Sequence, residues 1–214
     1  CGALFSYSFM SIDIFQSFLL GIVQGLSEFL PVSSSGHLVL LPWVFGFPDP
    51  GLAFDVALHA GTLISVLAYF YRDWFNIFGI CRDMPEYEGR RDMLLLLVVA
   101  TIPGAIAGFF LESLVETVFR HPILTAAMLA IFGGLLLVAD RRGPKARTLR
   151  EISFRDAVEI GAAQALSIIP GVSRSGITMT VALARGFDRV SAARFSFLLS
   201  TPIIFGAMLP HIPD

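Results

Sequence analysis

Four stretches of the sequence are apolar over roughly the 20 residues that a helix needs to cross a bilayer. They lie at about 52–71, 93–111, 123–139 and 191–210. The composition agrees, because 55% of the 214 residues are hydrophobic and only 15% are charged, against about 25% in an ordinary globular domain. The sequence therefore predicts an all-α integral membrane protein.

Two further apolar regions are interrupted by proline, serine and glycine. Region 12–47 is broken at 31–36, and region 157–186 is broken at 170–176. The piece 12–30 is long enough to cross, but the other pieces beside the breaks are too short. Apolar pieces of about 10–14 residues are typical of re-entrant or interfacial segments. We therefore expect helix-loop-helix segments that enter the membrane and return.

The basic residues indicate which loops face the cytoplasm. Thirteen of the 15 Lys and Arg residues lie in the segments 72–92, 140–155 and 185–194, whereas segment 112–122 holds only Arg120. Since basic residues accumulate on the cytoplasmic side, the three basic loops are predicted inside and 112–122 outside. The sides alternate correctly only if each of the four long stretches crosses once. Region 157–186 then begins and ends inside, which makes it re-entrant.

The interrupted regions are copies of one another. Residues 21–36 (GIVQGLSEFLPVSSSG) align without a gap on residues 161–176 (GAAQALSIIPGVSRSG), with eight identities. We interpret this as a duplication, with repeat one at about 12–139 and repeat two at about 157–214. Three predicted crossings separate the copies, so the second is inverted and region 12–47 is re-entrant from outside. In inverted repeats, broken helices meet near the bilayer midplane and form the binding site.

The two repeats differ in their number of crossings. The first has three after its re-entrant segment, and the second has one before the sequence ends at Asp214. We treat residues 1–214 as a single membrane domain and expect two further spans after Asp214.

Each break is followed by a predicted helix start, at Gly36 and at Gly176. Helix N-termini attract phosphate, and glycine lets the backbone approach the anion closely. Arg174 lies inside the second break, where a membrane-buried cation is a functional candidate and suits phosphate oxygens. The alternative is that Arg174 reaches an interface from a loop. Further hydroxyl donors are Ser33, Ser34, Ser35, Ser173, Ser175 and Thr178.

Glu28 and His37 add acid–base and metal chemistry to this pocket. A carboxylate such as Glu28 fits an anion site if a divalent cation bridges it to phosphate; the alternative is that it only neutralises Arg174. Gln24 lies one turn earlier on the same face and is a candidate weak ligand. His37 has the chemistry to move a proton near neutral pH, or it is a hydrogen-bonded structural residue.

Other polar features carry less functional weight. His59 follows Asp55 by four residues near the start of a predicted span, and we interpret this pair as interfacial structure. Cys1 and Cys81 have no metal-site spacing. The net charge of −2, without a basic patch interleaved with aromatic residues, gives no indication of nucleic-acid binding.

The motifs QGLSEFLPVSSSGH (24–37) and PGVSRSGIT (170–178) resemble the two signature regions of the bacterial undecaprenyl-pyrophosphate phosphatases, also called bacitracin-resistance proteins. The resemblance implies a multi-pass enzyme of the bacterial inner membrane. It would hydrolyse undecaprenyl diphosphate to undecaprenyl phosphate and inorganic phosphate, which recycles the lipid carrier for cell-wall synthesis and confers bacitracin tolerance. The expected partners are the polyprenyl diphosphate and membrane lipids, and a homodimer is a further expectation.

The resemblance and the residue chemistry described above together predict residue roles. Catalytic roles fall on Glu28, Ser34, His37 and Arg174, and substrate binding falls on Ser33, Ser35, Gly36, Gly171, Ser173, Ser175, Gly176 and Thr178. Ser34 would attack the terminal phosphorus or position a water that does. Glu28 and Gln24 would hold Mg²⁺ or Ca²⁺. Because the family often has Glu where this chain has Gln24, only one carboxylate remains for metal.

Three alternative functions share features with this sequence. A lipid-phosphate flippase or anion transporter would use the same inverted repeat. The type 2 phosphatidic acid phosphatases use a histidine nucleophile a few residues after a Ser-Arg pair, and residues 175–184 contain no histidine. A non-catalytic scaffold gives no reason for Arg174 and Glu28.

Overall fold

The computed structural model describes residues 13–81, 83–88 and 92–209, and in these ranges the chain forms helices and no strand. The α-helices are α1 (Ile14–Ser27), α2 (Ser34–Phe45), α3 (Leu52–Tyr69), α4 (Tyr71–Ile77), α5 (Met93–Leu114), α6 (Pro122–Arg142), α7 (Phe154–Gln164), α8 (Arg174–Ala184) and α9 (Arg189–Met208). Short 3₁₀ or π turns are η1 (Pro85–Tyr87), η2 (Val115–Phe119), η3 (Leu149–Glu151) and η4 (Ala165–Ile168). The predicted all-α class is confirmed.

Four of these helices are long and apolar enough to cross a membrane. They are α3, the Met93–Leu111 part of α5, α6 and α9. The bounds of these four helices agree with the four predicted stretches to within three residues at each end. The two further spans expected after Asp214 lie outside the described residues, and the repeat boundaries remain predictions.

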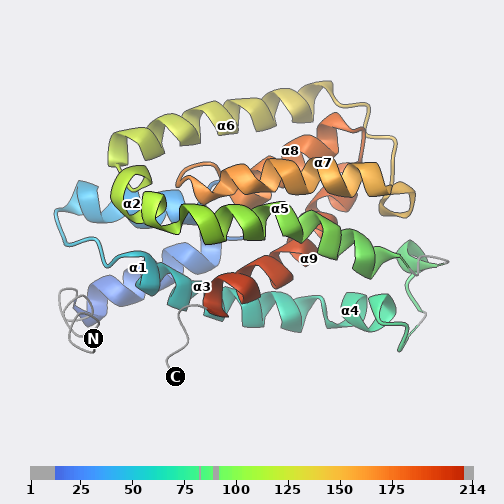
Figure 1. The fold of residues 1–214 in the computed structure, drawn as a ribbon, viewed down its shortest axis with the longest axis horizontal. Helices are drawn as coiled ribbons and strands as arrows, with labels where there is room; N and C mark the ends of the chain where they lie inside the picture. The colour runs from blue at the N-terminus through green and yellow to red at the C-terminus, as the bar shows by residue number, and fades with distance from the viewer. Residues whose placement is uncertain (1–12, 82, 89–91, 210–214) are drawn as a thin grey trace.

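The two interrupted regions form helical hairpins that enter from opposite ends of the molecule. In Figure 1, α1 and α2 come from the left end, whereas α7 and α8 come from the right end. Within each hairpin the two helices pack against each other. The breaks fall at residues 28–33 and 169–173. This is the geometry that an inverted repeat predicts.

Both helices that follow a break begin two residues before the predicted glycines. α2 starts at Ser34 because the Ser33 hydroxyl oxygen accepts a hydrogen bond from the Gly36 N–H at 3.2 Å. α8 starts at Arg174 because Ser173 caps the Gly176 N–H in the same way at 3.0 Å. Serine is a preferred N-cap for this reason, and the prediction of helix starts at the glycines was wrong by half a turn.

The tips of the two hairpins touch through glycine. A Cβ placed on Gly36 would lie 3.2 Å from the Gly171 Cα. Gly171 has a φ of +98°, and a Cβ there would lie 2.4 Å from the carbonyl oxygen of Thr125 in α6. Since a side chain fits neither the backbone conformation nor the space, Gly171 allows the tip of the second hairpin to lie directly against α6.

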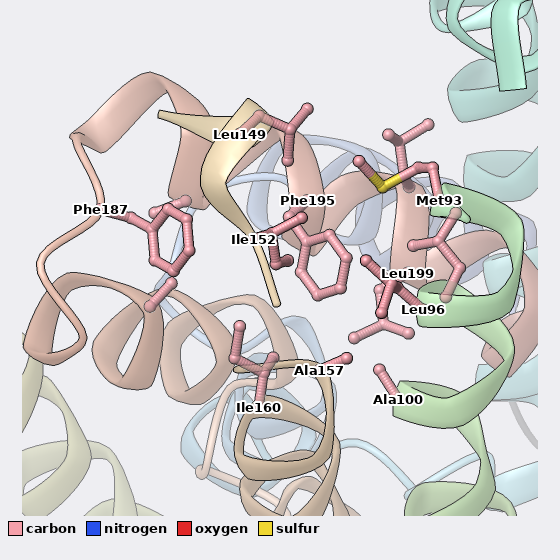
Figure 2. Packing of buried hydrophobic residues seen from close by; sticks show 14 of the residues in the cluster. Met93, Leu96, Ala100, Leu149, Ile152, Ala157, Ile160, Phe187, Phe195 and Leu199 are labelled. Atoms are coloured by element: carbon pink, nitrogen blue, oxygen red, sulfur yellow. The ribbon is translucent and has the colours of Figure 1, made fainter. Parts of the chain in front are cut away.

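The main apolar core lies among α5, α7, α9 and the turn η3. Figure 2 shows Ile152, Ala157, Ile160 and Phe195 gathered at its centre, with Ala100 of α5 alongside. Apolar packing of this kind holds α7 against α5, and α5 and α9 in turn form one wall of the region where the hairpin tips meet.

An ion-pair cluster fixes the start of α7. Asp156, which is fully buried, accepts hydrogen bonds from Arg147 at 2.6 Å and from Arg185 at 2.8 Å. It also accepts from Ser153, the N-cap of α7. Burial alone would raise the pKa of Asp156, but the bonds from Arg147, Ser153 and Arg185 outweigh it and hold the pKa well below its usual range.

Candidate active site

A cavity of about 600 Å³ lies where the hairpin tips meet. Both breaks contribute polar residues to its wall: Glu28, Ser33, Ser34, Ser35, Ser173, Arg174 and Ser175. Residues of α5 and α9 form an apolar part of the wall. A pocket that is mostly apolar with a few convergent polar groups is the usual form of a ligand site.

Glu28 is the centre of the polar contacts. The residue is 6% exposed. Arg174 donates a hydrogen bond from Nη2 to Oε1 of Glu28, and Ser34 donates from Oγ to Oε2 at 2.5 Å. Gln24 donates from Nε2 to Oε2 at 3.0 Å. The structure therefore joins four of the predicted site residues through one carboxylate.

The pairing of Glu28 with Arg174 links the two copies of the repeat. Arg174 is the first residue of α8, and its Nη1 also donates to the Ser196 carbonyl oxygen at 3.3 Å. A buried ion pair of this kind is weak evidence for stability, because desolvation offsets its attraction. It is compatible both with a phosphate site and with the plain neutralisation that the sequence left open.

The other predicted substrate-binding residues have varied surroundings. Ser175 donates from Oγ to the Leu30 carbonyl oxygen at 3.4 Å, which ties the tips together. Thr178 is fully buried, and its Oγ1 lies 2.7 Å from Ser196 Oγ, so it connects α8 to α9.

Gly36, Gly171, Gly176 and Thr178 are not among the residues that line the cavity. Their roles in binding remain predictions.

His37 does not face Glu28 in this structure. Its Nδ1 lies 2.7 Å from the Ser33 carbonyl oxygen, and it is not among the residues that line the cavity. The histidine beside the carboxylate is His59 of α3, whose Nε2 lies 3.3 Å from Glu28 Oε2. A proton role for His37 stays a prediction.

His59 is not among the site residues predicted from the sequence. The sequence predicted that His59 and Asp55 are interfacial structure, whereas both line the cavity. The signal was present, because two ionisable residues one turn apart inside a predicted span are functional candidates by default. Only the folded structure shows that this face of α3 turns toward the Glu28 break.

Arg120 lines the cavity together with Asp55 and His59. It donates from Nη1 to Asp55 Oδ2 at 2.6 Å and pairs also with Asp49. Burial alone would lower the pKa of Arg120, but the carboxylates of Asp55 and Asp49 raise it above its usual value. The guanidinium is therefore a permanent cation that ties the α5–α6 connection to the start of α3.

The donors for a metal ion are few. In the described part of the chain, no group of three or more His, Cys, Asp or Glu side chains could hold a metal ion. The side chain of Gln24 donates to Glu28 through Nε2, whereas its buried Oε1 has no hydrogen-bond partner. One carboxylate and one amide oxygen suit a hard cation that takes its remaining ligands from substrate phosphate and water.

Comparison with known proteins identifies the family of this chain. The family model described as bacitracin resistance protein BacA matches residues 17–212. The undecaprenyl-diphosphatase of Desulforudis audaxviator is 59% identical over 196 residues, which cover 91% of this chain and 74% of that protein. Those of Pelotomaculum thermopropionicum and Moorella thermoacetica are 54% and 53% identical, each over 94% of this chain and over 76% and 77% of their own lengths. The chain belongs to the bacitracin resistance protein BacA family.

Proposed function

We propose that this chain is an undecaprenyl-diphosphatase that releases the terminal phosphate of the lipid diphosphate and leaves undecaprenyl phosphate. The observation that carries the proposal is the convergence of Arg174 and Ser34 on Glu28 within the cavity between the hairpin tips. A cation for phosphate, a hydroxyl nucleophile and a proton acceptor thus lie side by side. The names of the relatives support the same activity.

The diphosphate would bind where α2 and α8 begin. The first residue of each helix directly follows a break. The unpaired N–H groups of a helix N-terminus and the positive end of the helix dipole stabilise phosphate oxygens. Arg174 would share its guanidinium between Glu28 and the substrate, since its five N–H donors exceed what Glu28 and Ser196 accept. Ser33, Ser35, Ser173 and Ser175 line the same wall and offer further hydroxyl donors.

Ser34 is the proposed nucleophile. Its Oγ would form a bond to the terminal phosphorus while the bond from that phosphorus to the bridging oxygen breaks, and undecaprenyl phosphate departs. The Ser34 proton would pass to Glu28 Oε2, which already accepts it in a hydrogen bond of 2.5 Å. Water would then release inorganic phosphate from the serine. In the alternative, Ser34 positions a water that attacks directly.

His37 is an alternative proton acceptor. It lies three residues after Ser34 in α2, so the two side chains lie on neighbouring positions of the helix surface. In this structure its Nδ1 contacts the Ser33 carbonyl oxygen.

The isoprenoid chain would lie between α5 and α9. There the cavity is lined by Gly104, Ala105 and Gly108 of α5 and by Ile203, Gly206 and Ala207 of α9. Five of these six residues are Gly or Ala, and their small size would leave room for a hydrocarbon chain that continues into the bilayer. Such a wall favours a lipid diphosphate over a water-soluble one.

We also propose that Glu28 and Gln24 hold Mg²⁺ or Ca²⁺ together with the substrate. The cation would neutralise phosphate charge, which matters because phosphoryl transfer depends mainly on positioning and charge stabilisation. A bacterial inner-membrane location and a homodimer are further proposals from the sequence. Membrane fractionation and crosslinking in membranes test them.

The activity is tested with purified protein in detergent, where transport has no compartment to act on. The assay measures inorganic phosphate released from undecaprenyl diphosphate, with undecaprenyl monophosphate as the control substrate. We expect release from the diphosphate only. A protein that is folded by size-exclusion chromatography and releases no phosphate, with or without Mg²⁺ and Ca²⁺, would contradict the proposal.

A further inference from the structure

His59 is held in one orientation by its own helix. Its Nδ1 lies 2.6 Å from the Asp55 carbonyl oxygen one turn earlier in α3. This contact directs the opposite ring nitrogen, Nε2, toward Glu28 Oε2 at 3.3 Å. The ring is 22% exposed and lines the same cavity as Ser34 and Arg174.

The helix that carries His59 is itself anchored beside the site. Arg120 binds the Asp55 carboxylate at 2.6 Å and also pairs with Asp49 in the segment before α3. The first turn of α3 is thereby fixed to the connection between α5 and α6. Because Asp55 also contacts the His59 ring, this anchor sets the position of Nε2 relative to Glu28.

Glu28 needs such a contact to present one oxygen to Ser34. A carboxylate rotates about its last side-chain bond unless both oxygens are held. Arg174 holds Oε1, and the contacts to Oε2 come from Gln24 in α1, Ser34 in α2 and His59 in α3. During reaction the Ser34 contact is lost as Oγ bonds to phosphorus. Gln24 and His59 then remain to hold Oε2.

We infer that His59 is a positioning residue for the phosphatase reaction, whose Nε2 contact keeps Glu28 Oε2 aimed at Ser34. Because each ring nitrogen faces an acceptor oxygen, the ring donates to both as an imidazolium. This inference rests on the proposed function. The repeat provides no second copy of it, because the position 140 residues later is Leu199 and that aligned with Glu28 is Ile168. The first copy thus supplies both the carboxylate and the residue that orients it.

Two amide substitutions separate this role from a purely structural one. The amide nitrogen of Gln matches the position of histidine Nε2, whereas that of Asn matches Nδ1. His59→Gln therefore keeps the donor to Glu28, and His59→Asn keeps only the contact with Asp55. His59→Leu removes both. His121→Leu is the matched control, since His121 is an exposed residue before α6.

The experiment measures kcat and KM for phosphate release from undecaprenyl diphosphate, with folding checked by size-exclusion chromatography and thermal melting. We expect His59→Leu and His59→Asn to lower kcat about 10- to 100-fold with little change in KM, the size of effect expected for loss of one hydrogen bond to a charged group. His59→Gln should recover most of the activity, and His121→Leu should match the wild type.

A double-mutant cycle adds a readout that a structural role would not move. In a Glu28→Gln background, His59→Leu should cause no further loss of kcat, because the group that His59 orients is gone. Equal fold losses in both backgrounds, a His59→Gln variant as weak as His59→Asn, or a folded His59→Leu variant with wild-type kcat would overturn the inference. An inactive wild type would instead overturn the proposed function itself.

Discussion

Arg174 of α8 donates to the Glu28 carboxylate that follows α1, across 146 positions of sequence. The contact joins the tips of two hairpins that enter from opposite ends of the fold (Figure 1). Polar groups are tolerated in the interior of a membrane protein when they are enclosed by protein and form hydrogen bonds with one another. A phosphate that enters the cavity meets a cation, two helix N-termini and the hydroxyl of Ser34 in one place.

The proposed nucleophile is tested by Ser34→Ala. If Ser34 forms the covalent intermediate, its loss should lower kcat at least about 1,000-fold, since no neighbouring serine bonds to Glu28 Oε2. A loss of only about 10- to 100-fold would favour the water-positioning role. The control is Ser65→Ala, which alters an exposed serine of α3. Undiminished phosphate release by Ser34→Ala would exclude both roles.

The proposed metal site predicts dependence on a divalent cation. Chelation should abolish phosphate release, and Mg²⁺ or Ca²⁺ should restore it. Gln24→Glu adds a carboxylate beside Glu28 and should lower the cation concentration needed for half-maximal activity about tenfold, because hard cations bind carboxylate more tightly than amide oxygen. Titration of activity with each cation measures this. Full activity of both proteins in excess chelator would disprove the metal role.

The contact between the tip of the second hairpin and α6 requires glycine at position 171. Gly171→Ala places a Cβ 2.4 Å from the Thr125 carbonyl oxygen at a φ of +98°. Backbone strain of this kind costs about 1–3 kcal/mol before the clash is counted. We expect a lower melting temperature in detergent. Gly25→Ala is the control, because nothing lies within 4 Å of its Cβ, and alanine should raise helix stability slightly. Equal melting temperatures of the two variants would argue against the close contact between Gly171 and α6.

The Asp156 cluster predicts a loss of stability in acid. Because the folded pKa of Asp156 is held below its unfolded value, its contribution is fully present above about pH 4 and is lost as pH falls through the folded pKa. Asp156→Asn resembles the protonated residue and should melt about 3–10 °C lower at pH 7. The difference in melting temperature between wild type and Asp156→Asn should become smaller toward pH 3. A constant difference across this range would show that Asp156 does not titrate as described.

Most of the architecture was predictable because a helix that crosses a bilayer must have a minimum length and an apolar surface. The four long helices and both breaks follow from these constraints. The helix starts were misplaced because glycine was given priority over serine as the boundary, whereas Ser33 and Ser173 cap the helices. The exact start of each helix therefore depends on the hydrogen bond from its capping serine and not on the position of the glycine.

The site was predictable where the repeat brings residues together and not where tertiary packing does. Glu28 and Arg174 lie in the aligned segments 21–36 and 161–176, so the duplication predicts their approach. His59 lies in a helix outside the aligned segment, and its contact with Glu28 depends on how α3 rotates against the first hairpin. No sequence spacing encodes that rotation.

The most direct test of the account is phosphate release by Arg174→Ala and Arg174→Lys, each compared with Arg155→Ala, whose side chain is 77% exposed in the wild type. If Arg174 binds the diphosphate at the meeting hairpins, Arg174→Ala should lose at least about 100-fold in kcat/KM. Arg174→Lys should recover only part, because lysine lacks the planar fork. Arg155→Ala should be unaffected. Wild-type kcat/KM in a folded Arg174→Ala protein would contradict the account.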